Sequence, residues 1–114
     1  MSFIVLEKHG GLKYATIITD KEGNNLIFDN YIDAQKEADD CQDGMVIPYF
    51  GFIDHVTEED DSITVLSKNI KTVIKHNDIG ISIDVYKQNE DFINLNNGKN
   101  EKLIREEQIF FEDF

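Results

Sequence analysis

The residue types that most often act as nucleophiles occur here without the neighbours that would activate them. Cys41 is the single cysteine of the 114 residues, and Asp39, Asp40 and Asp43 lie close to it in the sequence. Carboxylates raise the pKa of a thiol, whereas a reactive cysteine needs a positive neighbourhood or a helix N-terminus. We therefore expect Cys41 to be a buried, unreactive thiol. The serines fit no nucleophile-elbow pattern.

The three histidines, His9, His55 and His76, lack the spacing that would let two of them share a metal ion. One cysteine is also too few for a zinc finger. The sequence therefore predicts no catalytic residues, no metal site and no cofactor. The enzymatic alternative is a site centred on His9, or on His76 with Asp84, in a pocket formed by the two halves of the chain.

Charge is the most unusual property of this sequence. Eleven basic and 23 acidic residues give a formal net charge of −12. Residues 1–57 carry 4 basic and 10 acidic side chains and residues 58–114 carry 7 and 13, so each half has a net charge of −6. Direct binding to nucleic-acid phosphates or to an anionic membrane is disfavoured, because both need clustered Lys and Arg.

The sequence also indicates a compartment. A single cysteine permits no internal disulfide, which is typical of a reducing cytoplasm. The apolar run at residues 3–6 is followed at once by Glu7 and Lys8, and it is too short for a signal peptide. No stretch approaches the roughly 20 apolar residues of a membrane span. We expect a cytoplasmic protein that does not bind membranes.

The first half predicts a ββ(β)αβ arrangement. Residues 3–8 and 12–19 are rich in β-branched and aromatic side chains, and the two glycines at 10–11 suit a hairpin turn between them. In the register that this turn implies, Leu6 lies opposite Ala15. These glycines lack the continuation that a phosphate-binding loop requires.

A polar turn at residues 20–24 is followed by a further strand at 25–28. After the helix described next, residues 45–49 are predicted to form another strand. Pro48 cannot donate a hydrogen bond to a neighbouring strand, so we expect this strand to lie at a sheet edge.

One helix is predicted in the first half. Asn30 can cap it, with Asp33 in the capping-box position three residues later. Gly44 is expected to end it. The apolar stripe consists of small and aromatic side chains at helical spacing, Tyr31, Ala34, Ala38 and Cys41.

Residues 51–61 are predicted to form a solvated joint, because they contain a run of four carboxylates. We expect a single domain over residues 1–114, since a chain of this length fits one core. Residues 1–57 and 58–114 are possible sub-units of that domain.

The second half is rich in predicted hairpins. Residues 63–66 form a short strand, and residues 70–76 and 81–86 pair with His76 opposite Ile81. This register gives one apolar face and one mixed face, as expected for a half-buried antiparallel hairpin.

Residues 92–95 and 103–111 could extend that sheet, with a turn at 97–98 between them. The segment 103–111 could equally form two helical turns. The fold class predicted is therefore α+β, a small, mostly antiparallel β-sheet domain with one short helix.

Two surfaces are candidates for binding a partner. The first is acidic and consists of two groups of carboxylates, one on the predicted helix and one in the predicted joint. If both groups lie on one side of the molecule, they could imitate nucleic-acid phosphates; otherwise they are a polar helix face and a solvated loop. The second is the phenylalanine-rich C-terminus, which we expect to pack on the core of the protein, the alternative being a dimer or partner interface. The residues concerned are Asp39, Asp40, Asp43, Glu58, Glu59, Asp60 and Asp61 for the first surface, and Phe110, Phe111 and Phe114 for the second.

The function predicted is that of a small, acidic, non-enzymatic binding protein that acts by protein–protein contact. Its partner is a protein that could present a basic surface, and a homodimer is also possible. The size and charge are typical of a bacterial or phage regulator or inhibitor. One alternative is a nucleic-acid mimic that blocks a DNA- or RNA-binding enzyme of host defence. Another is a self-associating structural protein.

Overall fold

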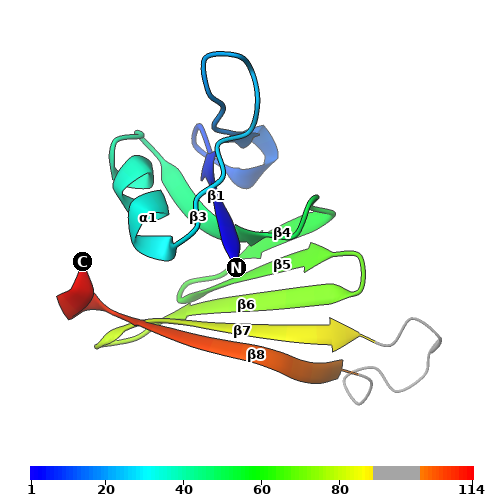
Figure 1. Ribbon diagram of the computed structural model, residues 1–114. Helices are drawn as coiled ribbons and strands as arrows, with labels where there is room; N and C mark the ends of the chain where they lie inside the picture. The colour runs from blue at the N-terminus through cyan, green and yellow to red at the C-terminus, as the bar shows by residue number, and fades with distance from the viewer. Residues whose placement is uncertain (89–100) are drawn as a thin grey trace. The chain divides into compact units, whose positions relative to one another are not determined.

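The chain is an α+β protein, as the sequence predicts. The computed structural model describes residues 1–88 and 101–114, which form one α-helix, short 3-10 turns and two antiparallel sheets (Figure 1). The chain divides into two compact units, Met1–Gly51 and Phe52–Phe114. None of the helices in the described ranges is long and apolar enough to cross a membrane.

In the first unit, β1 (Ser2–Glu7) lies between β2 (Thr16–Ile17) and β3 (Gly44–Tyr49) in a three-stranded antiparallel sheet. Ile4 of β1 lies opposite Ile47 of β3, and neither side chain is accessible to solvent. Burial of such aliphatic side chains is the main term that stabilises the unit.

β3 is an edge strand of its sheet, which confirms the prediction made from Pro48. Pro48 lies opposite Phe3, and Phe3 exchanges both backbone hydrogen bonds with Phe28, at 2.9 and 2.8 Å. The Phe3–Pro48 pair is therefore not hydrogen-bonded. The ring nitrogen of Pro48 falls on the outer side of the strand, where the missing N–H costs no ladder bond.

The predicted register of the first hairpin is wrong. Leu6 pairs with Ile17 and not with Ala15. The reason is a 3-10 helix over Leu12–Tyr14, which occupies most of the space where the second strand was expected to begin. The strand predicted over 12–19 is consequently reduced to β2.

The turn of that hairpin also lies one residue earlier than the two glycines suggest. Its central residues are His9 and Gly10, with φ angles of 54° and 96°. The N–H of Gly11 closes the turn by donating to the carbonyl of Lys8 at 3.1 Å. Positive φ at both central positions is the geometry of a primed turn, in which Gly10 has no steric cost.

The polar turn at 20–24 is confirmed. The backbone N–H of Asp20 donates to the carbonyl of Asn24 at 2.8 Å, and Asp20 Oδ1 accepts from the N–H groups of Glu22 and Asn24, both at 2.9 Å. The strand predicted after it does not form. That segment contacts its neighbours through isolated bridges at Asn25 and Phe28, and through the N–H of Leu26, which donates to the carbonyl of Ile18 at 3.0 Å.

The predicted helix is α1 (Tyr31–Asp39), and its cap is confirmed. Asn30 Oδ1 accepts from the N–H of Asp33 at 2.9 Å, while Asn30 Nδ2 donates to the Asp33 carboxylate at 3.0 Å. The first bond satisfies one orphan backbone N–H at the helix start, and the second joins the two side chains. The helix packs on β1 and β3 through its buried stripe, Tyr31, Ala34 and Ala38.

Gly44 does not end the helix, contrary to the prediction; it is the first residue of β3. A Cβ at this position would lie 2.5 Å from the carbonyl oxygen of Ala38 and 2.8 Å from its Cα. Glycine is therefore needed here because β3 starts against the helix backbone, and not because the chain must take a left-handed conformation.

The second unit is a five-stranded antiparallel meander in which consecutive strands are neighbours (Figure 1). Part of the segment predicted as a solvated joint is a strand, since the sheet begins at His55. The strands are β4 (His55–Glu58), β5 (Ser62–Ser67), β6 (Ile70–His76), β7 (Gly80–Gln88) and β8 (Glu101–Phe110).

The register predicted for β6 and β7 is confirmed. His76 pairs with Ile81, and Ile74 pairs with Ile83 on the buried face. The C-terminal alternative is also resolved, because β8 is a strand paired with β7 and not a pair of helical turns. The strand predicted at 92–95 and the turn at 97–98 lie outside the described residues.

We expect Gly44→Ala to lower the free energy of unfolding by about 1–3 kcal/mol, because the added methyl group would overlap the backbone of Ala38 and force β3 away from the helix. Gly11→Ala is the matched control. Its Cβ would meet the Tyr14 ring at an ordinary 3.8 Å, and the backbone of Gly11 is extended. Urea unfolding followed by circular dichroism measures both variants. Equal stability of the two would contradict this assignment for Gly44.

Candidate functional site

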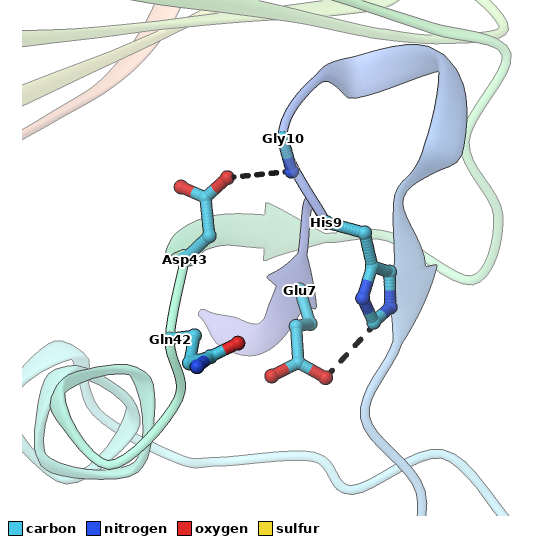
Figure 2. Close-up of a pocket in the computed structure, with 5 residues that line it drawn as sticks. All are labelled: Glu7, His9, Gly10, Gln42 and Asp43. Carbon is cyan, nitrogen blue, oxygen red and sulfur yellow. Dashed lines mark hydrogen bonds and ion pairs between the residues drawn. The ribbon is translucent and has the colours of Figure 1, made fainter.

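The first unit contains an open pocket of about 610 Å³ where β1 ends (Figure 2). Its walls come from the last residue of β1, from the turn that follows, and from the segment between α1 and β3. The Glu7 carboxylate lies between the side chains of Gln42 and His9 in this view. The lining residues are Glu7, His9, Gly10, Gln42 and Asp43.

Asp43, one of the carboxylates selected from the sequence, has a structural role in this pocket. Its Oδ2 accepts from the N–H of Gly10 at 3.1 Å, and its Oδ1 lies 3.5 Å from Lys8 Nζ. The Asp43 carbonyl also accepts from the N–H of Lys8 at 2.9 Å. Both carboxylate oxygens thus hold the 8–11 turn against the segment that leads into β3.

Glu7 and His9 are the pocket residues whose types most resemble the acid and base of a catalytic site. His9 Nε2 lies 3.7 Å from Glu7 Oε1 and 3.2 Å from Thr16 Oγ1. A hydrolytic triad needs the acid on one ring nitrogen and the hydroxyl nucleophile on the other. Here both contacts meet the same nitrogen, so the arrangement can hold a polar or cationic group but provides no proton relay to Thr16.

The other enzymatic alternative pairs His76 with Asp84, and the hairpin keeps these two apart. His76 lies opposite Ile81, whereas Asp84 lies opposite Val73. The two pairs are separated by an odd number of positions along the ladder. Side chains alternate between faces along a strand, so His76 and Asp84 are on opposite faces of the sheet. In the ranges 1–88 and 101–114, no group of three or more His, Cys, Asp or Glu side chains could hold a metal ion.

Cys41 is partly buried, just beyond the C-terminus of α1. Its Sγ donates to the carbonyl of Glu37 at 3.4 Å. Burial raises the pKa of the thiol above its ordinary value, and the nearby carboxylates of Glu7, Glu37 and Asp40 raise it further. Of the three carboxylates that the sequence placed near Cys41, only Asp40 is among these, and the larger cause is burial, which depends on the packing of the helix end.

The remaining acidic residues selected from the sequence fall into two groups, one in each unit. Asp39 and Asp40 are exposed at the end of α1, where Asp39 accepts from the Gln35 side chain at 2.8 Å. Glu58 ends β4 and residues 59–61 join β4 to β5; all four of these side chains are exposed. Each group is a solvated carboxylate surface in its own unit.

The C-terminal phenylalanines do not pack into a core, contrary to the expectation from the sequence. Phe110, Phe111 and Phe114 are 40, 46 and 49% exposed. Phe110 ends β8, and the chain then turns through a 3-10 helix, Phe111–Asp113, that places the Phe111 and Phe114 rings edge to face at 5.9 Å. The Phe111 and Phe114 rings therefore contact each other just beyond the end of β8, where Phe110 is also exposed.

A fourth apolar side chain extends this group. The N–H of Phe111 donates to the carbonyl of Ile79 at 2.9 Å, and Ile79 is 60% exposed in the β6–β7 turn. Nothing in the sequence indicates this hydrogen bond, because it depends on the pairing of β7 with β8. We call Ile79, Phe110, Phe111 and Phe114 the C-terminal patch.

The same pairing creates a repulsive contact that the sequence also did not indicate. Asp84 of β7 lies directly opposite Glu106 of β8. Like charges at directly opposite positions destabilise a sheet. Among the described residues, neither carboxylate has an ion-pair partner.

Comparison of this chain with protein-family models, with curated proteins and with solved structures finds no match.

We expect the Cys41 thiol to react with iodoacetamide more slowly at pH 8 than an unfolded-state thiol, because its raised pKa leaves less thiolate. The protonated thiol is the form that the folded state favours. Its contribution to stability is therefore present below the ordinary thiol pKa of 9.0 and is lost as the pH rises through the folded-state value.

Glu37→Gln should speed the reaction of Cys41, since it removes a nearby negative charge while keeping the backbone acceptor. Glu22→Gln, in the polar turn at 20–24, is the control and should leave the rate unchanged. Mass spectrometry of the alkylated protein over time gives the rates, with the urea-unfolded chain as reference. A folded-state rate equal to the unfolded one would refute the assignment.

Proposed function

We propose that this chain is a non-enzymatic binding protein and that the C-terminal patch is its contact surface. The observation that supports this most is the exposure of its three phenylalanines, at 40–49% of their surface, beside the still more exposed Ile79. Large apolar side chains are costly to expose together, and such groups mark protein–protein contact sites. Aromatic residues are also enriched at the centre of interfaces.

The charge around the patch supports a partner with a basic rim. Asp78 adjoins Ile79, and Glu112 and Asp113 lie between the phenylalanines in the sequence; all three are exposed. A lysine or arginine of the partner could pair with these carboxylates, or lie over the face of a phenylalanine ring. A small regulator or inhibitor protein, such as bacteria and phages produce, would use a surface of this kind.

A nucleic-acid mimic is the second candidate, favoured by the four exposed carboxylates at 58–61. A complex formed through those carboxylates should weaken steeply between low and moderate salt, whereas an apolar contact should hardly change. Self-association through the C-terminal patch is the third candidate, and a monomer in sedimentation at high concentration would exclude it.

The test compares the unaltered full chain with two variants. Each is immobilised and exposed to extract from the native host. The double variant Phe111→Ala/Phe114→Ala should lose the specifically captured protein, with binding to the purified partner weakened at least about tenfold. Ile27→Ala removes an equally exposed apolar side chain from the first unit and should bind normally. Quantitative mass spectrometry and then titration calorimetry provide the readouts.

Capture that survives in the double variant would overturn the proposal. If capture were instead lost on Glu59→Gln/Asp60→Asn/Asp61→Asn and by raising the salt concentration, the mimic would replace it.

A further inference from the structure

β8 is the last strand of the five-stranded sheet, and it is ten residues long. Its outer side has no strand neighbour among the described residues. Phe111, directly after β8, donates its N–H to Ile79 at 2.9 Å, and hydrogen-bonded pairs alternate along an antiparallel ladder. It follows that Glu106, Gln108 and Phe110 direct their backbone N–H and C=O groups outward.

The regular part of this edge is its second half. A shift of register between Val85 and Tyr86 leaves Ile104 without a partner in β7, so a bulge interrupts the strand there. From Arg105 to Phe110 the pairing with β7 is unbroken. This segment can therefore offer a straight row of three outward N–H and three outward C=O groups to another strand.

Charge decides what kind of strand fits. On one face, Arg105 Nε lies 3.9 Å from Glu107 Oε2, so these two charges largely offset each other. On the other face, Glu106 and Asp84 repel each other across the β7–β8 pair. A strand added outside β8 would place a residue opposite Glu106, where a lysine or arginine would relieve this repulsion.

A second copy of the chain fits poorly at the same place. An antiparallel, two-fold symmetric pairing centred on Glu106 would align this carboxylate and Asp84 with the same two from the other copy. Centring the pair on Arg105 or on Glu107 also brings identical charges together at the axis. A pair centred on Gln108 avoids this and is opposed by the net charge alone. The net charge of −12 per chain adds to the repulsion.

The geometry points to Arg105–Phe110 as an acceptor edge for β-strand addition, where an extended, basic segment of a partner protein pairs with β8. Backbone hydrogen bonds would supply affinity, and a basic side chain opposite Glu106 would supply specificity. One end of the added strand would lie beside Phe110, so the edge continues into the C-terminal patch. This inference rests on the proposed function, and it specifies the partner and its mode of binding.

The test uses fluorescently labelled peptides and the full chain, with binding measured by fluorescence anisotropy at low and physiological salt. The first peptide alternates lysine with valine and is long enough to span Arg105–Phe110. The second replaces each lysine with glutamate. The third keeps the lysines but replaces each valine with proline, which preserves the charge and prevents strand pairing. We expect binding of the first peptide alone.

Two variants separate the backbone from the charge. Gln108→Pro removes an outward N–H and no hydrogen bond of the β7–β8 ladder, and it should weaken the lysine–valine peptide about tenfold relative to Gln108→Ala, which loses the same side chain but keeps that donor. Circular dichroism and thermal unfolding check that both variants fold. Glu106→Lys should also weaken the peptide about tenfold, while raising the melting temperature because it ends the repulsion with Asp84.

Equal binding of the lysine–valine and lysine–proline peptides, or equal affinity of Gln108→Pro and Gln108→Ala, would overturn the strand-addition proposal. If the natural partner were still captured by Gln108→Pro and Glu106→Lys but lost by Phe111→Ala/Phe114→Ala, the proposed function would stand and the edge would not be its binding mode. If every variant still bound both the peptide and the partner, the strand-addition proposal and the proposed function would both be refuted.

Discussion

The turn between β6 and β7 is the constraint on which the candidate surfaces of the second unit depend. Asn77 Oδ1 accepts from the N–H groups of Ile79 and Gly80, at 3.1 and 2.9 Å, and the Asn77 N–H donates to the Gly80 carbonyl at 2.9 Å. This fixes the register of the hairpin. A Cβ on Gly80 would overlap the carbonyl oxygen of Ile109, so β8 can reach its place only because this residue is glycine.

Everything at the C-terminus follows from that docking. The pairing of Gly80 with Phe110 sets the end of β8, and the hydrogen bond from Phe111 to Ile79 brings the phenylalanines beside the turn. The same register places Glu106 opposite Asp84. A slip by one residue would move every side chain of β8 to the other face of the sheet.

The sequence predicted those parts of the fold that depend on neighbouring residues. The β6–β7 register was correct because alternating side chains and a short turn determine it together. The helix cap at Asn30 was correct for the same local reason. The β1–β2 register was wrong because the 3-10 helix at Leu12–Tyr14 has no comparable signal. Gly44 was wrongly assigned to the helix end. The real reason for glycine there is its contact with Ala38, which the sequence cannot show because it is made only when β3 pairs with β1.

The candidate surfaces divide in the same way. Exposure of the carboxylates at 58–61 could be predicted, since a run of like charges cannot be buried. The pocket could not, because it joins Glu7 to Asp43 through the β1–β3 pairing of Glu7 with Gly44. The phenylalanines were expected to be buried solely because their side chains are large and apolar. Where they lie depends on β8 ending at the corner of the sheet, which only the tertiary pairing determines.

The opposite border of the five-stranded sheet has a consequence for assembly. β4 has only four residues, and it runs directly into the acidic run at 58–61. Open filaments grow when one end of a subunit attaches to the other end of the next. A neighbouring copy has neither the length nor the charge at β4 to join head to tail with β8. If β8 accepts a guest strand as proposed, a complex formed there would therefore not extend through β4 into a filament.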